Sequence, residues 1–169
     1  SCPGHRYQSE IVVQPTETQK GLKVHTCTLC GETYEEELPM LVPVKPAAVS
    51  GLKVKKQTSN ALTFSWKKVD GVKYRLILYK GNKKVSAKYI SGNSYKFTKL
   101  VGSADYKLRV TPYREVNGKK IYAEKDKEVK TATAPGTVKL SSVKKSGKNK
   151  AKVTWKEIPG ASGYEIYMK

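Results

Sequence analysis

Apolar and polar residues alternate along most of the middle of the chain, which is the period-two pattern of half-buried β-strands. Leu62, Phe64 and Trp66 are separated by single polar residues, so that one face of this segment is apolar. The same alternation resumes at Tyr74, after a turn predicted at Asp70-Gly71. No long segment has apolar residues at the spacing of an amphipathic helix. The pattern therefore predicts an all-β fold.

Further short strands are expected on both sides of a strong hairpin signal. Asn117-Gly118 lies between two extended runs, and both residues tolerate the positive φ of a type I′ turn. The strands before it are expected over residues 83–90, 94–97 and 106–110, and one strand is expected after it, over roughly 120–131. Short strands at this spacing, separated by turn residues, predict a β-sandwich.

The chain contains an internal repeat. Trp66 and Trp155 are 89 residues apart, and the same shift aligns several other landmarks of the two segments. These pairs are Pro46 with Pro135, Val49 with Val138, Val54 with Val143, Lys67 with Lys156 and Gly71 with Gly160. One inserted residue then brings Tyr164 onto Tyr74. A period this long indicates tandem domains rather than a solenoid.

Cysteine content and proline spacing divide the chain into three parts. All three cysteines precede residue 31, and Pro39, Pro43 and Pro46 then form a stiff, extended hinge. We therefore expect a small module over residues 1–42, a sandwich over 43–133, and the first three strands of a second, incomplete sandwich over 134–169. Those three strands are expected at 138–143, 150–155 and 163–168. Three strands cannot bury enough apolar surface, so we expect the protein to continue past Lys169, or a strand-swapped neighbour to complete this sandwich.

Residues 44–133 resemble a fibronectin type III domain, an immunoglobulin-like β-sandwich. The resemblance rests on the Pro46 entry, a Trp in the second strand, a Tyr that opens the third, and a Leu and Tyr pair like the family's tyrosine corner. It implies that six side chains are structural core residues rather than ligand-binding aromatics: Trp66, Tyr74, Leu100, Tyr106, Trp155 and Tyr164.

The N-terminal module carries a candidate metal site. Cys2-Pro-Gly-His5 and Cys27-Thr-Leu-Cys30 each present two soft or borderline donors across a two-residue gap, and two such turns complete the tetrahedral shell of a zinc ion. A module of this size has almost no core, and zinc binding of about 10–16 kcal/mol can supply its folding energy. With four protein ligands the zinc would be structural. Two alternatives remain open: a disulfide or redox pair at Cys27 and Cys30, and His25 as the ligand in place of His5.

The module also resembles a zinc-binding repeat found in surface proteins of Gram-positive gut bacteria. The matching residues are Cys2, His5, Pro15-Thr16, Gly21-Leu22-Lys23, Cys27, Cys30, Gly31 and Tyr34. Glu17 departs from the pattern, because the family often has a further cysteine there. The resemblance implies an extracellular spacer or adhesive array with a zinc-knuckle or zinc-ribbon-like module.

The net charge of +19 narrows the possible partners only a little. Most cations are lysines that alternate with apolar residues, as outward-facing strand positions do, and only four are arginines. We interpret them first as a solvated surface and rank nucleic acid low among the partners. Clusters occur at Lys119-Lys120 and among the lysines from Lys144 to Lys152. No apolar run is long enough to span a membrane.

No catalytic grouping is found, since the chain has two histidines and no nucleophile elbow or phosphate-binding loop. We therefore predict a non-enzymatic structural or adhesive region of a modular bacterial surface or secreted protein, whose partners are its own neighbouring domains and a host protein or glycan. One alternative is the accessory region of a secreted carbohydrate-active enzyme whose catalytic domain lies elsewhere. Another is direct binding of nucleic acid or an acidic glycan through the lysines.

Overall fold

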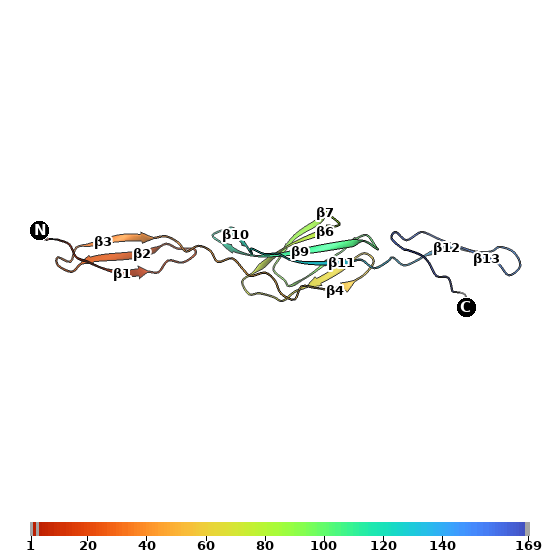
Figure 1. Cartoon of the computed structure of the whole chain (residues 1–169), viewed down its shortest axis with the longest axis horizontal. Helices are drawn as coiled ribbons and strands as arrows, with labels where there is room; N and C mark the ends of the chain where they lie inside the picture. The colour runs from red at the N-terminus through yellow and green to blue at the C-terminus, as the bar shows by residue number, and fades with distance from the viewer. Residues whose placement is uncertain (1, 3, 168–169) are drawn as a thin grey trace. The chain divides into compact units, whose positions relative to one another are not determined.

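Every regular element of the chain is a β-strand within the part that the computed structural model describes, which is residue 2 and residues 4–167. These residues form thirteen strands arranged in four sheets (Figure 1). The all-β fold expected from the alternating pattern is thus confirmed. Among the same residues, no helix has the length and apolarity needed to cross a membrane.

The N-terminal module is a three-stranded antiparallel sheet in the order β1-β2-β3. Its strands are β1 (Tyr7–Val13), β2 (Gly21–Cys27) and β3 (Thr33–Leu38). Most of its side chains are exposed, and Cys27 is the only buried hydrophobic side chain among its described residues, 2 and 4–46. The sheet is therefore held by its backbone ladder and by whatever surrounds Cys27, because it has almost no apolar core.

The chain divides into two compact units, the first of which joins the residues up to Pro46 with Arg114–Tyr122. Within this unit the Arg114 guanidinium pairs with the Glu17 carboxylate and donates a hydrogen bond to the Val44 carbonyl over 2.7 Å. The Val44 N–H donates to the same carboxylate over 2.8 Å. The Arg114 hydrogen bond and the Val44 N–H lower the pKa of Glu17. These contacts fix the proline-rich segment onto the β9–β10 hairpin.

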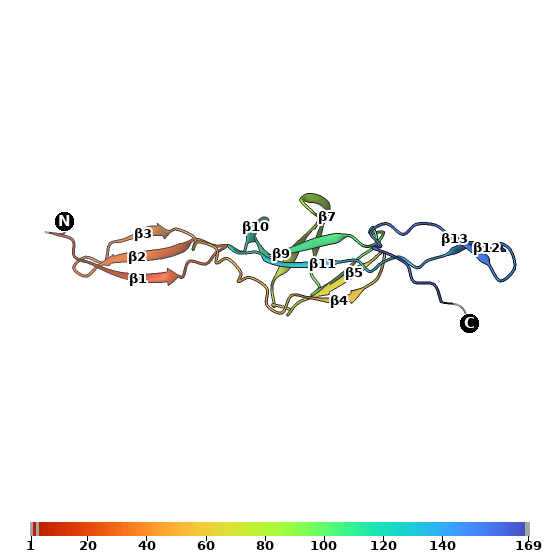
Figure 2. The same ribbon diagram turned by 45° about the vertical axis from the view of Figure 1, so that its right-hand side comes forward.

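The second unit, Ala47–Tyr113 with Ala123–Lys169, contains most of a sandwich of two sheets. One sheet has the order β4-β5-β8, with β4 (Lys53–Gln57), β5 (Leu62–Ser65) and β8 (Ser94–Phe97). The other has the order β10-β9-β6-β7. Strand β11 also pairs with β9 and lies beside it in Figure 2. Its strands are β6 (Lys73–Lys80), β7 (Lys83–Ile90), β9 (Asp105–Val116), β10 (Lys119–Tyr122) and β11 (Lys127–Ala132).

The core of the sandwich lies between these two sheets and follows the apolar phase of the alternation. Buried residues come from the inward positions of β5, β6, β8 and β9, together with two residues outside the strands. They are Val49, Leu62, Phe64, Trp66, Tyr74, Leu76, Leu78, Phe97, Tyr106, Leu108 and Val110. Burial of this set removes much apolar surface from water, which is the main favourable contribution to the folding of such a domain.

The hairpin after β9 forms as predicted, but the strand expected over 120–131 is two strands. Asn117 and Gly118 have φ values of 49° and 72°, as a type I′ turn requires. The ladder then breaks opposite Pro112, whose carbonyl accepts a hydrogen bond from the Ala123 N–H over 2.9 Å. Proline has no N–H to return the second bond of this pair. The pairing therefore ends at β10 and resumes at β11.

The second copy contains only two of its three predicted strands. Strands β12 (Leu140–Lys145) and β13 (Ala151–Trp155) pair in an antiparallel manner. The strand expected at 163–168 is not formed in residues 163–167, and Met168 lies outside the described residues. The equivalent strand of the first copy, β6, is paired on both sides, by β7 and β9. Without such partners among the described residues, an alternating sequence makes no ladder.

Candidate metal centre

The antiparallel pairing of β1 with β2 brings the two halves of the predicted metal site together. Tyr7, at the start of β1, is the register partner of Cys27, at the end of β2. The segment that carries Cys2 and His5 therefore lies beside the turn from Cys27 to Cys30. One ligand atom from each of these four residues lies within 4.8 Å of the others. The structure thus collects all four predicted donors.

The turn itself has the conformation of a knuckle. The Gly31 N–H donates to the Cys27 carbonyl over 2.9 Å, and the Cys27 N–H donates to the Glu32 carbonyl over 2.8 Å. Gly31 has a φ of 76°, which residues with a Cβ adopt with strain. This tight return directs the Cys27 and Cys30 sulfurs toward one point.

The distances between donor atoms fit a tetrahedral ion. Metal–sulfur bonds of about 2.3 Å and metal–nitrogen bonds of about 2.0 Å imply sulfur–sulfur separations of about 3.8 Å and sulfur–nitrogen separations of about 3.6 Å. The Sγ atoms of Cys2 and Cys27 are 3.9 Å apart, and Cys30 Sγ is 3.6 Å from His5 Nδ1. All three cysteines are free thiols, with no disulfide between Cys27 and Cys30. The four residues could hold one metal ion.

The protonation of the thiols also suits a cation. Burial opposes ionisation of Cys27, but backbone N–H groups of the knuckle outweigh it and lower the pKa of this thiol to about 6. The Glu32 N–H favours the Cys30 thiolate, yet the Cys27 sulfur, burial and the Cys2 sulfur together outweigh that effect and raise the pKa of Cys30 to about 11. Two thiolates thus repel each other at this point, and a shared cation would relieve the repulsion.

Residues around the four donors orient them, and the sequence motifs alone did not indicate this shell. His5 Nε2 lies 3.5 Å from the Glu32 carboxylate, while its Nδ1 faces Cys30. A carboxylate on the far nitrogen is the usual outer partner of a metal-bound histidine. The His5 ring also stacks on Tyr7, with ring centroids 5.5 Å apart. The only sequence signal for this role of Glu32 is that a carboxylate residue lies two positions after the predicted ligand Cys30.

His25, the alternative ligand, is engaged elsewhere. Its Nδ1 is 2.7 Å from the Ser9 hydroxyl and its Nε2 is 2.8 Å from the Glu36 carboxylate. The ring is buried and stacks on Tyr34, with ring centroids 4.4 Å apart. His25 is not part of the four-residue group, because both of its ring nitrogens already have partners within the sheet.

The six side chains predicted to be structural lie as follows. Trp66, Tyr74 and Tyr106 are buried in the sandwich, and Leu100 packs against its core. The Tyr106 hydroxyl accepts a hydrogen bond from the Val101 N–H over 3.0 Å, which closes a corner between β8 and β9.

The second copy repeats the contacts of the first. Tyr74 and Tyr164 each accept a hydrogen bond from a backbone N–H, over 2.9 Å from Val69 and 2.6 Å from Ile158. Each tyrosine also meets a tryptophan edge-on, with ring centroids 5.3 Å apart for Trp66 and 5.2 Å apart for Trp155. Trp155 and Tyr164 are only half-buried.

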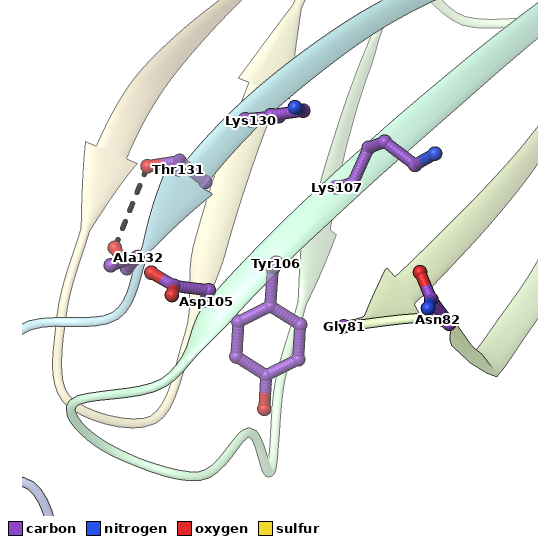
Figure 3. A pocket seen from close by; sticks show the side chains of 8 residues that line it. All are labelled: Gly81, Asn82, Asp105, Tyr106, Lys107, Lys130, Thr131 and Ala132. Carbon is purple, nitrogen blue, oxygen red and sulfur yellow. Dashed lines mark hydrogen bonds between the residues drawn. The ribbon is translucent and has the colours of Figure 1, made fainter.

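A hollow of about 640 Å³ lies at one end of β9 and β11. Figure 3 shows Lys107 and Lys130 on these neighbouring strands, and the Thr131 hydroxyl bonded to the Ala132 carbonyl. Asp105 is the only carboxylate among the lining residues, which include neither histidine nor cysteine.

Comparisons with known proteins bear on the sandwich. A family model described as "Fibronectin type III domain" matches residues 47–130. A crystal structure of domains A168–A170 from titin has a TM-score of 0.49 at 16% identity, over 78% of this chain and 50% of that one. The d3–d4 domains of the rat CD45 extracellular region give a TM-score of 0.43 at 16% identity, over 75% of this chain and 65% of that one. The chain thus spans about half the length of the titin structure. No curated protein matches the chain.

Proposed function

We propose that this chain, which contains a fibronectin type III domain over residues 47–130, is a non-catalytic spacer and adhesive region of a modular exported bacterial protein. Domains of this family are in general structural or interaction modules, and the architecture is common in cell-surface proteins. The observation that carries the proposal is the group of four metal donors at the end of a sheet that has almost no core.

Zinc is the metal that this donor set favours. Three thiolates and one imidazole in a tetrahedral arrangement are typical of structural zinc sites. Cys2, His5, Cys27 and Cys30 would supply all four ligands, so no coordination position would be left for water or a substrate. The ion would therefore hold the chain segments together and would not activate a reactant.

The exposure of the module explains why it needs such an ion. Ile11, Val12 and Leu29 are 43%, 51% and 58% exposed, and Tyr34 is 49% exposed. Little apolar surface is thus removed from water when β1, β2 and β3 form, and burial alone cannot offset the ordering entropy of the segment. Metal binding provides the missing folding energy, as it does in other small metal-dependent modules.

A matched pair of histidine variants tests the zinc site. We expect about one zinc per chain by elemental analysis, with the metal lost in His5→Gln and retained in His25→Gln. Cobalt substitution should give the visible bands of a tetrahedral site with thiolate ligands. The zinc site is disproved if the wild-type chain binds no divalent metal, or if the two variants lose it equally.

The cellular part of the proposal has a separate test. Antibodies against residues 47–130 should label intact cells of the source organism, or detect the protein in the culture medium. Labelling that requires permeabilised cells would contradict an exported location and would leave the zinc assignment standing.

A further inference from the structure

The acidic residues of the first sandwich are confined to one side of it. Within residues 47–133, all six carboxylates lie on the strands of the sheet that contains β6, β9 and β11, or on the loops next to those strands. They are Asp70, Asp105, Glu115, Glu124, Asp126 and Glu128. Strands β4, β5 and β8 carry none. The two sheets of one domain therefore differ in whether carboxylates accompany their lysines, although the strands of both sheets carry more cations than carboxylates.

The outer face of the β4–β5–β8 sheet is basic and hydroxyl-rich. Leu62 and Phe64 point into the core, so Thr63 and Ser65 of β5 point outward. Lys56 and Lys96 are the register partners of Thr63, one on each side. Two strand spacings of about 4.8 Å place these lysines about 10 Å apart across the face. The outer face thus presents lysine ammonium groups on both sides of the small hydroxyl side chains of β5.

A groove continues this face around the edge of the sandwich. It lies between the edge strands β7 and β8, has a volume of about 420 Å³, and contains no carboxylate among its lining residues. Besides two tyrosines, its polar lining has four lysines and two small hydroxyl residues: Lys80, Lys88, Lys96, Lys99, Ser86 and Thr98. The volume is in the range of small-ligand sites. Lys96 belongs to both the groove and the face, so the two are continuous.

The four lysines of the groove lack counter-ions among the described residues, unlike the cations Lys107 and Arg109 on β9. Arg109 and Lys107 on β9 lie 2.8 Å and 3.5 Å from the Glu128 carboxylate. In the described part of the chain, none of the four groove lysines has a carboxylate within 4.0 Å. Like charges gathered without counter-ions raise each other's energy, and an anionic ligand would relieve this repulsion.

The same basic face occurs in the second copy. The 89-residue shift brings Lys55-Lys56 onto Lys144-Lys145. Lys144 is in turn the register partner of Lys152 on β13, and neither β12 nor β13 contains a carboxylate. The charge of this face therefore follows the repeat, as the core positions do.

We infer that the groove between β7 and β8, with the adjoining outer face of β4–β5–β8, binds a linear acidic polysaccharide, carboxylated or sulfated. This inference deepens the adhesive part of the proposed function and does not depend on the metal. Lysine binds single anionic groups as a point charge, and serine and threonine hydroxyls hydrogen-bond to sugar oxygens. Three aromatic residues line the groove, but Phe97 and Tyr106 are buried in the core and Tyr95 packs against it. The outward positions of β5 and β8 carry no aromatic ring. Few rings are thus left on which bases could stack, which favours a glycan over a single-stranded nucleic acid.

Titration with defined polymers tests the inference. The probes are heparin as the sulfated chain, polygalacturonate as the carboxylated chain, dextran as the neutral chain, and a duplex DNA. We expect the intact protein to bind at least one acidic polysaccharide, and dextran not at all. The triple variant Lys88→Gln, Lys96→Gln, Lys99→Gln should weaken this binding by about ten-fold at 0.15 M salt and reduce the salt slope by about two, since each cation contributes about 0.7.

A charge-matched control separates the site from the general charge of the protein. The triple variant Lys119→Gln, Lys125→Gln, Lys127→Gln removes the same charge from exposed positions near the other sheet and should change the affinity less than two-fold. Equal losses in the two variants, absence of binding to both acidic polysaccharides, or duplex DNA binding of equal strength would each overturn the inference. Thermal unfolding verifies that both variants are folded. Chelated protein should bind unchanged, so failure of the zinc site would be seen separately.

Discussion

The N-terminal module and the sandwich differ in what can offset the entropy lost when their strands become ordered. The module has three strands and one buried hydrophobic residue, Cys27, among its described residues. The sandwich buries eleven core residues between two sheets. Both are antiparallel β-structures of exposed, polar outer faces. The comparison teaches that strand pairing alone does not stabilise a small β-structure. The favourable free energy of folding must come from a buried core or from a bound metal.

Removal of the metal is expected to have the largest effect, and to separate the module from the sandwich most clearly. We expect chelation to abolish amide protection in β1, β2 and β3, because no core remains to hold them, while the strands of the sandwich keep theirs. Hydrogen exchange measured with and without chelator provides the test. Protection that persists in β2 after the metal has been removed would show that the module has an energy source other than its four donors.

Truncation of the buried tryptophan is the corresponding test of the sandwich. Trp66→Ala should destabilise the domain by about 3–5 kcal/mol, since the side chain is 3% exposed and packs edge-on against Tyr74. Trp155→Ala should cost far less, because the equivalent face of the second copy is only half-buried. Urea denaturation followed by circular dichroism gives both values. Equal losses in the two variants would mean that the second copy is packed as tightly as the first.

Loss of one hydroxyl at the corner between β8 and β9 should have an intermediate effect. Tyr106→Phe leaves the Val101 N–H without its acceptor, which should cost about 1–2 kcal/mol. Tyr79→Phe is the matched control, because its ring lies beneath Lys107 and Arg109 on the outer face. The same denaturation experiment applies. A control that loses as much stability as the corner variant would assign the effect to the aromatic ring and not to the hydrogen bond.

The smallest effect is expected from acid. The Arg109 hydrogen bond lowers the pKa of Glu128 in the folded protein. The stabilisation from this pair is therefore complete above the ordinary carboxyl pKa of about 4.3 and is lost as the pH falls through the lowered folded value. Its size should be below about 1 kcal/mol, because both side chains are about one third exposed. Thermal melts of the wild type and Glu128→Gln between pH 3 and 6 measure it, and a difference in stability that was largest at pH 3 and fell toward pH 6 would contradict the assigned sign.

The sequence contained enough to predict the sandwich and to nominate the four metal donors. Alternation at period two marked Leu62, Phe64 and Trp66 as inward residues, and all three are buried. The turn residues Asn117 and Gly118 defined one hairpin to the residue. These features are local, so that neighbouring residues alone determine them. The spacing of the cysteines was equally local, and the structure gathers the donors it indicated.

Features that depend on distant partners could not be predicted. Arg114 and Glu17 pair across 97 residues, and neither lies in a pattern that points to the other. The prediction of a single strand over 120–131 was wrong, because the pairing is interrupted opposite Pro112, which lies on the neighbouring strand. The prediction of a third strand in the second copy was wrong because alternation indicates only which side of a segment is apolar. A hydrogen-bonded ladder also needs a neighbouring strand. His5 and His25 could be ranked, but only the register of β1 and β2 separates their roles.

The edge strand β4 has a consequence for tandem repeats. A bulge interrupts its register between Val54 and Lys56, and its outward positions carry lysines. Adjacent domains of similar sequence are prone to exchange strands while they fold, because an unfinished edge in one accepts the equivalent strand of the other. A kinked and positively charged edge repels a second copy of itself. We therefore expect the lysine pair at this edge to disfavour strand exchange between neighbouring domains during synthesis.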